Sequence, residues 1–201
     1  MQFFDNTIKY YNLESKTFTN TTQSVDFEDT QKRFLSKLPP TSHLLDFGCG
    51  SGRDTKYFLT RGYNVDAIDG SVEMCKIAAE YTNIPVTQML FQQLEEQEKY
   101  DGIWACASIL HLPLQDIETV LHKMSRALKS FGIIYTSFKY GTFEGERNGR
   151  YFTDMTEETF AVLLKRIPTL TLEEQWISSD VRPGRGDEKW LNLILQKLNI
   201  H

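Results

Sequence analysis

The sequence predicts one α/β domain, built on a doubly wound, seven-stranded mixed sheet whose last strand is antiparallel, with helices on both faces. Three observations predict this fold class. After residue 40, apolar runs alternate with amphipathic runs of helical spacing, which is typical of parallel strands joined by crossover helices. The last two apolar runs have no helix between them, so they should form an antiparallel pair. Finally, 201 residues of which 40% are hydrophobic are enough for one continuous core.

The seven expected strands are short apolar runs bounded by glycine, proline or polar turn residues. They lie at residues 43–47, 63–69, 86–91, 100–106, 132–138, 170–177 and 190–195. The helices between them are predicted from apolar residues three and four positions apart, which share one helical face. The helical residues expected to face the sheet are Met74, Ile77, Ala78 and Tyr81; Ile117, Val120, Leu121, Met124 and Leu128; and Phe160, Leu163, Leu164 and Ile167.

Short polar side chains mark where several helices should begin. Ser71 and Thr156 are expected to cap two of the core helices, because their hydroxyls accept hydrogen bonds from free N–H groups of the first turn. Asp26 should cap an earlier helix in the same way. The apolar face of that helix would carry Phe27, Phe34, Leu35 and Leu38. We therefore expect residues 1–40 to form a helical cover on the core of residues 41–201, within a single domain.

Composition excludes several classes of protein. The chain has 22 Lys+Arg against 27 Asp+Glu, a formal net charge of −5, which disfavours binding to the phosphate backbone of nucleic acids. The three cysteines are far apart, so neither a disulfide framework nor a metal site is expected. The most apolar stretch, residues 102–114, is too short to span a membrane, and the first residues lack a secretory leader. These features predict a cytoplasmic protein without a membrane partner.

A glycine-rich loop, GCGSG at residues 48–52, follows the first predicted strand. Ligands of open α/β sheets bind beyond the carboxyl ends of the strands, where the strand order reverses. Glycine in such a loop permits positive φ and lets the backbone touch the ligand. Asp69 ends the second strand, where a carboxylate accepts hydrogen bonds from both hydroxyls of a ribose. The two features together predict a nucleoside site; the alternative is a tight turn beside a solvated strand end.

Two kinds of phosphate-binding loop have glycine patterns similar to this one. A nucleoside-triphosphatase loop requires Gly-x-x-x-x-Gly-Lys-[Ser/Thr]. Here Gly52 is followed by Arg53, and the lysine that this pattern requires is missing. A dinucleotide loop requires Gly-x-Gly-x-x-Gly, whereas the third glycine here comes one residue early. An acidic residue, Asp46, also stands immediately upstream. The sequence therefore excludes a nucleoside-triphosphatase loop and disfavours a dinucleotide loop.

The run Leu45-Asp46-Phe47-Gly48-Cys49-Gly50-Ser51-Gly52 closely resembles the first signature of the Rossmann-like (class I) S-adenosylmethionine-dependent methyltransferases. The resemblance extends from about residue 43 to residue 195, through the acidic end of the second strand, the Tyr100-Asp101-Gly102-Ile103 start of the fourth and the closing antiparallel pair. Within the family, the small-molecule enzymes of the tellurite-resistance type are the subgroup that the chain resembles. The cofactor that this implies is S-adenosyl-L-methionine.

The resemblance also assigns cofactor contacts residue by residue. The amino-acid end of the cofactor would meet the loop at Asp46, Gly48, Cys49 and Gly50. Its ribose hydroxyls would meet Asp69 and its adenosine Gly70, while Ala107 and Ser108 would lie near the methionine moiety. In one respect the chain departs from the family pattern. Many members carry an aspartate near the adenine amino group after the third strand, whereas this chain reads Met-Leu-Phe-Gln-Gln at residues 89–93.

Residues after the fourth and fifth strands are candidates for the methyl-acceptor site. His111 follows the fourth strand and could accept a proton from the acceptor; the alternative is a structural hydrogen bond within the loop. Tyr11 lies in the N-terminal segment, which in this family often covers the site. Guanidinium groups bind carboxylate or phosphate through two parallel hydrogen bonds, so an anionic acceptor is predicted. The arginines expected at this rim are Arg147, Arg150, Arg182 and Arg185, with salt bridges to Glu144, Glu146, Asp180 and Asp187 as the alternative.

The function expected from these features is methyl transfer to a small, anionic acceptor. Two alternatives stay open at this point. One is a non-catalytic, regulatory module that binds S-adenosylmethionine, and the other is a methyltransferase acting on RNA or protein. Turnover separates the regulatory module from an enzyme, because a sensor would bind the cofactor without forming S-adenosylhomocysteine. The acceptor atom and the oligomeric state are not legible in the sequence.

Overall fold

The computed structural model describes residues 2–199, with side-chain environments from residue 6 onward. Three helices come first: α1 (Gln2–Leu13), α2 (Ser15–Thr22) and α3 (Glu28–Leu35). The core helices are α4 (Arg53–Thr60), α5 (Val72–Thr82), α6 (Leu114–Ala127) and α7 (Glu157–Leu164). Two short 3₁₀ helices, η1 (Phe91–Gln93) and η2 (Ile109–His111), lie between them. Within the described residues, no helix has the length and apolar character needed to cross a membrane.

The main sheet has seven strands in the order β3-β2-β1-β4-β5-β9-β8. Their bounds are β1 (His43–Phe47), β2 (Asn64–Asp69), β3 (Val86–Gln88), β4 (Tyr100–Ala105), β5 (Leu128–Lys139), β8 (Leu170–Ser179) and β9 (Lys189–Lys197). The first five are parallel, and β9 lies antiparallel between β5 and β8. The predicted mixed sheet with an antiparallel last strand is therefore confirmed. The strand order reverses between β1 and β4, so a crevice is expected at their carboxyl ends.

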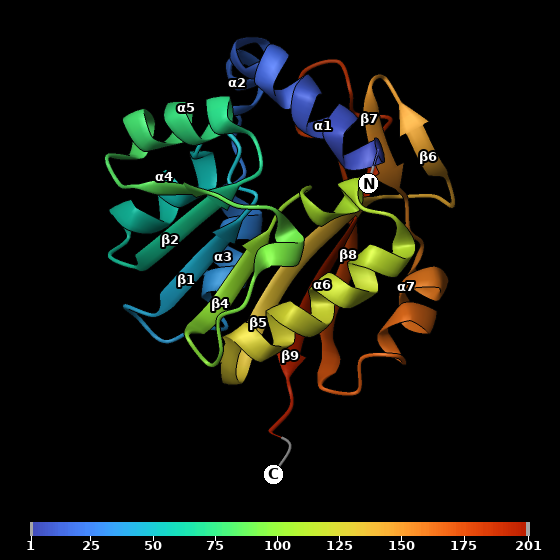
Figure 1. The fold of residues 1–201 in the computed structure, drawn as a ribbon. Helices are drawn as coiled ribbons and strands as arrows, with labels where there is room; N and C mark the ends of the chain where they lie inside the picture. Colours follow the sequence, from blue (N-terminus) through green and yellow to red (C-terminus); the bar gives the residue numbers. More distant parts are fainter. Residues whose placement is uncertain (1, 200–201) are drawn as a thin grey trace.

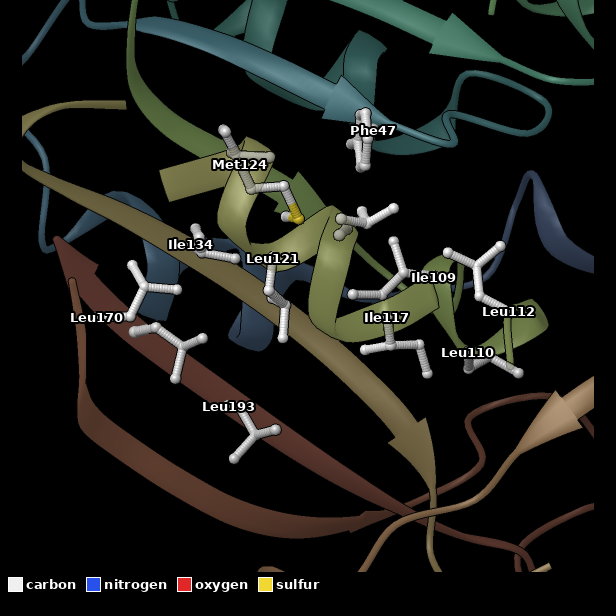
Figure 2. Packing of buried hydrophobic residues seen from close by; sticks show 14 of the residues in the cluster. Phe47, Ile109, Leu110, Leu112, Ile117, Leu121, Met124, Ile134, Leu170 and Leu193 are labelled. Atoms are coloured by element: carbon white, nitrogen blue, oxygen red, sulfur yellow. The ribbon is translucent and has the colours of Figure 1, made fainter. Parts of the chain in front are cut away.

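Helices cover both faces of the sheet (Figure 1). On one face α6 and α7 pack over the larger core cluster, which Figure 2 shows from close by. Leu121 and Met124 of α6 point toward Ile134 of β5 and Phe47 of β1 there, and all four side chains are buried. The five residues that the sequence predicts on the buried face of this helix are all buried. Leu128, the last of them, is the first residue of β5 and lies outside α6.

The opposite face is covered by α3, α4 and α5. Its cluster is aromatic: Trp104 of β4 stacks on Tyr135 of β5 with ring centroids 4.1 Å apart. Phe34 of α3 and Phe58 of α4 meet the Trp104 ring edge-on at 5.2 and 5.3 Å. Aromatic rings favour such edge-to-face and offset contacts beyond their simple burial. The predicted apolar face of residues 27–38 is thus what holds α3 on the sheet.

The predicted caps of α5 and α7 are confirmed. The Ser71 hydroxyl accepts a hydrogen bond from Met74 N at 3.2 Å, and the Thr156 hydroxyl accepts one from Thr159 N. Asp26 differs from the prediction: Phe27 is the residue at the start of α3, although the Asp26 carboxylate does accept from Glu28 N at 2.9 Å. The third strand also ends earlier than expected, at Gln88, because the chain turns into η1.

Two expectations were wrong. Tyr81 of α5 is 40% exposed, and the buried positions near it are Ala78 and Thr82. The glycine- and arginine-rich segment after β5, for which the sequence pattern predicts a loop, forms an antiparallel hairpin of β6 (Glu144–Arg147) and β7 (Arg150–Thr153). In Figure 1 this hairpin stands beside α1, above the carboxyl ends of the strands.

Candidate active site

One cavity of about 200 Å³ lies at the carboxyl ends of the parallel strands. The Gly48–Gly52 loop after β1, the end of β2 and the segment after β4 form one part of its wall. The N-terminal helices α1 and α2 also contribute to the wall, through Thr7, Ile8, Tyr11, Phe18 and Thr22, and Figure 1 shows them above the carboxyl ends of the strands. Seven of the eight residues predicted for the cofactor line this cavity: Gly48, Cys49, Gly50, Asp69, Gly70, Ala107 and Ser108.

The glycine loop is shaped by hydrogen bonds to β2. Gly48 N and Cys49 N both donate to Ile68 O, at 3.0 and 2.9 Å. Gly48 has φ +90°, and a Cβ there would lie 2.5 Å from the Ser108 Cβ. Gly50 has φ +54°, and the sole described atom within 4 Å of an added Cβ is Phe18 Cε1 at 3.6 Å. The absence of a side chain at Gly48 therefore allows the glycine loop to lie close to the segment after β4, whereas the absence of a side chain at Gly50 leaves open space beside its backbone.

Asp69 lies at the end of β2 and ties the loop to the start of α5. Its Oδ2 accepts from Gly50 N at 2.9 Å, and its Oδ1 accepts from Ser71 N at 2.8 Å. Burial raises the pKa of this carboxyl, although the backbone N–H groups oppose the shift. Each carboxylate oxygen has a second lone pair, so Asp69 retains the capacity to accept two ligand hydroxyls. The loop and this carboxylate fit a nucleoside.

Asp46 is the predicted cofactor residue that does not line the cavity. Its buried carboxylate lies below the loop and accepts a hydrogen bond from Thr55 Oγ1 at 2.5 Å. Burial, together with the charge of Asp54, raises the pKa of Asp46 to about 8. The geometry gives Asp46 a place under the loop, so its direct contact with the cofactor stays a prediction.

His111 is buried at the end of η2, and both of its ring nitrogens are engaged. Nδ1 lies 2.7 Å from Tyr151 O, and Nε2 lies 2.9 Å from the Tyr11 hydroxyl. Burial lowers the pKa of His111 to about 3, with the positive charges of Arg150 and Arg147 acting in the same direction. The imidazole is therefore neutral. Tyr11, predicted in the N-terminal cover, reaches it from α1.

The four predicted arginines separate into two groups. Arg147 donates to Asp154 through two nitrogens, at 2.9 and 2.5 Å, and Arg185 donates to Glu188 at 2.5 and 2.8 Å. Neither of these two arginines lines the cavity. Arg182 lines it, but its guanidinium is paired with the buried Asp180. Four carboxylates were expected as alternative salt-bridge partners of these arginines, and of the four, Asp180 is the one that forms such a salt bridge.

Arg150 differs from the other three. It lines the cavity, and no carboxylate of the described residues lies within ion-pair distance of it. Its Nη1 donates to the Tyr11 hydroxyl at 3.3 Å, and its guanidinium carbon lies 4.4 Å from the centre of the Tyr10 ring. Its Nε is buried without a hydrogen-bond partner. An unpaired, partly desolvated guanidinium favours an anionic ligand.

Sequence reasoning missed several residues of the wall. Arg53 and Asp54 form an ion pair beneath it, and Asp54 also accepts from Trp104 Nε1 at 2.8 Å and Gln31 Nε2 at 2.6 Å. Their position directly after the glycine loop was the available signal. Trp190 and Asn192 enter the wall from β9, and no sequence pattern marked them.

The sheet order and the cavity beyond β1, β2 and β4 define the fold of the Rossmann-like methyltransferases. Comparison with known proteins agrees with this class. Residues 44–132 match a family model described as a methyltransferase domain. The "Putative methyltransferase YqeM" of Bacillus subtilis (strain 168) is 27% identical over 124 residues, which are 56% of this chain and 50% of that protein. The chain thus matches about half the length of this curated relative.

Solved structures show the same fold over nearly the whole chain. The 1,6-didemethyltoxoflavin-N1-methyltransferase of Burkholderia thailandensis, solved with its substrate and S-adenosylhomocysteine, is 22% identical with a TM-score of 0.75; 96% of this chain and 85% of that one are covered. The [4+2]-cyclase SpnF is 13% identical with the same TM-score, covering 94% of each chain. The match over residues 44–132 agrees with the predicted methyltransferase domain, and the solved structures share its fold.

Proposed function

We propose that the protein transfers a methyl group from S-adenosylmethionine to a small acceptor that carries an anionic group. One observation carries this proposal: a single cavity joins the glycine loop and Asp69 on one side to His111 and the unpaired Arg150 on the other. S-adenosylmethionine, when bound, supplies a methyl group that is already activated on a sulfonium. The chain therefore has to align the acceptor and exclude water.

The cofactor half rests on backbone and carboxylate groups. Asp69 would accept hydrogen bonds from the ribose hydroxyls while it holds Gly50 N and Ser71 N. Gly50 leaves the space beside its own backbone free for the amino-acid end. Met89, Leu90 and Phe91 line the cavity where an adenine would be held by apolar contact, in place of the family's aspartate.

In the acceptor half of the cavity, one of the four predicted arginines has a guanidinium group that no carboxylate of the described residues already binds. A salt bridge already satisfies the guanidinium groups of Arg147, Arg182 and Arg185. Arg150 alone among the four has a buried N–H group without a partner. Helices α1 and α2 also cover the cavity, which favours a small acceptor over a nucleic acid or a folded protein.

The cofactor assignment is tested by Asp69→Ala. Hydrogen bonds to a charged group contribute roughly 1.5–3 kcal/mol each, so the variant should bind S-adenosylhomocysteine at least about tenfold more weakly than the wild type. Calorimetric titration measures this, and circular dichroism verifies the fold. A matched control is Asp66→Asn, on the same strand and outside the cavity, which should bind normally. Unchanged affinity in folded Asp69→Ala would remove Asp69 from the site.

The acceptor assignment is tested with Arg150→Lys. Lysine keeps the charge but loses the planar pair of donors, so turnover with an anionic acceptor should fall about tenfold or more while affinity for S-adenosylhomocysteine stays the same. Formation of S-adenosylhomocysteine is followed with a panel of small carboxylates and phosphates that bear hydroxyl or amino groups. Arg185→Lys is the control, because Arg185 lies outside the cavity. A neutral or cationic best acceptor, or wild-type kinetics in Arg150→Lys, would contradict the proposal.

If the wild type binds S-adenosylhomocysteine but forms none from S-adenosylmethionine with any acceptor, the regulatory module is the better description. The solved cyclase of the same fold shows why turnover has to be measured: this architecture is found in a protein named for another reaction. The fold alone therefore leaves the chemistry open, and the acceptor assay decides it.

A further inference from the structure

A row of hydrogen bonds crosses the acceptor half of the cavity. Arg150 Nη1 donates to the Tyr11 hydroxyl at 3.3 Å, and that hydroxyl lies 2.9 Å from His111 Nε2. On the other side of the imidazole, Nδ1 lies 2.7 Å from Tyr151 O. The three side chains come from three separate parts of the chain: α1, η2 and β7.

The direction of each hydrogen bond follows from the chemistry of its ends. A backbone carbonyl only accepts, so Nδ1 of His111 carries a hydrogen and donates it to Tyr151 O. The imidazole is neutral, because its pKa is lowered to about 3, so Nε2 has a free lone pair and accepts. Tyr11 therefore donates its hydrogen to Nε2, and its oxygen accepts from Arg150.

This arrangement determines which group an acceptor can meet. The lone pair of His111 Nε2 is already used by Tyr11, and the other ring nitrogen is used by Tyr151 O. The Tyr11 oxygen accepts from Arg150 and keeps further acceptor capacity, and Tyr11 lines the cavity. An acceptor that donates an O–H or N–H hydrogen bond would thus find Tyr11 ahead of His111.

We propose that Tyr11 takes the proton of the methyl acceptor and passes its own proton to His111 Nε2; this inference rests on the proposed function. The acceptor's bond to hydrogen breaks, and its proton binds the Tyr11 oxygen. The phenolic hydrogen would move to Nε2, while the electron pair released on the acceptor would form the bond to the methyl carbon as the methyl–sulfur bond of S-adenosylmethionine breaks and leaves its electron pair on sulfur. Tyr11 ends as a neutral phenol and His111 as an imidazolium that still donates from Nδ1 to Tyr151 O.

Arg150 links this relay to the charge of the acceptor. Its guanidinium contacts the same Tyr11 oxygen, and its charge and that of Arg147 add to the larger effect of burial, which lowers the pKa of His111. An anionic group bound at Arg150 would offset that charge and so favour proton transfer to His111. The acceptor that Arg150 selects would in this way also complete the proton-accepting site.

The test removes the hydroxyl of Tyr11 and, in a separate control variant, that of a tyrosine outside the cavity. Positioned proton transfer contributes typically 10²–10⁴-fold, so Tyr11→Phe should lower the single-turnover rate with the best acceptor of the carboxylate and phosphate panel by at least about 100-fold. Affinity for S-adenosylhomocysteine should change by less than about threefold. Tyr81→Phe makes the same change at an exposed position of α5, outside the cavity, and should keep the wild-type rate.

His111→Gln shows whether the two residues act as a unit. If they do, the double variant with Tyr11→Phe should be no slower than the slower single variant, because groups of one relay are strongly non-additive. The relay would be overturned if the losses of the two single variants multiplied in the double variant, or if the rate of Tyr11→Phe stayed within about threefold of the wild type. An equal loss of rate in Tyr81→Phe would overturn it as well.

A measurement that does not require turnover separates this inference from the proposed function. Ring ¹⁵N signals of His111, assigned by their loss in His111→Gln, should show hydrogen on Nδ1 and an accepting Nε2 in the complex with S-adenosylhomocysteine. The Nε2 signal should shift in Tyr11→Phe. A hydrogen on Nε2 would overturn the relay in every case. Failure of the proposed function would instead appear as no S-adenosylhomocysteine formed by the wild type.

Discussion

Two neighbouring carboxyl groups beneath the glycine loop illustrate how local contacts set the charge of a residue. Burial acts against the charged form of Asp54, but Arg53, Trp104 and Gln31 donate to it and hold its pKa below the usual value. Burial and the charge of Asp54 raise the pKa of Asp46 to about 8. The sequence shows both residues as acidic, and their opposite shifts arise only from their partners in the fold.

Asp46→Asn should therefore change how stability depends on pH. Between about pH 4 and pH 8 the folded chain keeps a proton that the unfolded chain has released, so the contribution of Asp46 to the free energy of unfolding falls as the pH rises. Asparagine removes this dependence. Relative to the wild type, the variant should gain about 1–3 kcal/mol between about pH 5 and pH 7.5.

Urea denaturation at the two pH values measures this difference. Asp187→Asn, which removes an exposed carboxyl away from the core, is the control for the change in net charge. An equal difference from the wild type at both pH values would show that Asp46 is ionised throughout, as in the unfolded chain.

The two glycines of the loop should respond differently to substitution. In Gly48→Ala the new Cβ meets Ser108 at 2.5 Å with φ at +90°, so the free energy of unfolding should fall by about 2 kcal/mol or more. Gly50→Val adds strain of about 1–2 kcal/mol, but the nearest described atom to its Cβ, Phe18 Cε1, lies at 3.6 Å. It should stay folded and lose binding of S-adenosylhomocysteine. Normal binding by Gly50→Val in a calorimetric titration would mean that the loop is merely a turn.

At the scale of single elements, the hairpin of β6 and β7 was missed although the sequence carried a signal for it. Asn148 and Gly149 connect the two strands with φ of +50° and +74°, which suits a two-residue hairpin turn. The strands themselves hold few apolar residues, so no alternation drew attention to them. Their partners are supplied by distant segments: Thr7 Oγ1 accepts from Tyr151 N at 3.0 Å.

Helix α1 depends on such distant contacts as well. The Asn12 Oδ1 accepts from the Ser71 hydroxyl at 2.7 Å and from Glu73 N at 3.3 Å, which ties α1 to the start of α5. Asn12→Ala should loosen this attachment by about 1 kcal/mol, so amide exchange in residues 2–13 and dissociation of S-adenosylhomocysteine should both be about fivefold faster. Lys9→Ala, an exposed change on the same helix, is the control. Equal exchange in both variants would show that Asn12 does not hold the helix.

At the scale of the whole molecule, the sheet was predictable and its cover was only partly so. Alternating strands and helices and one short connection predicted a mixed seven-stranded sheet with an antiparallel end, whereas the order of the strands, with β9 between β5 and β8, was not predicted. The helical cover was expected, but not that Tyr11 would reach His111 across the cavity. Helix α1 is attached to the core by polar contacts with His111, Ser71 and Tyr151, which leave no periodic pattern in the sequence.

The place of β9 in the sheet affects how the chain can fold during synthesis. Strand β9 lies between β5 and β8 and pairs with both, although both precede it in the sequence. When β5 leaves the ribosome, the strand that covers its outer edge has not yet been translated, and β8 cannot take its place because it pairs only with β9. An apolar strand edge of this kind is a site of association between nascent chains. Completion of the sheet therefore waits for β9, and until then this edge of β5 is open to pairing with another chain.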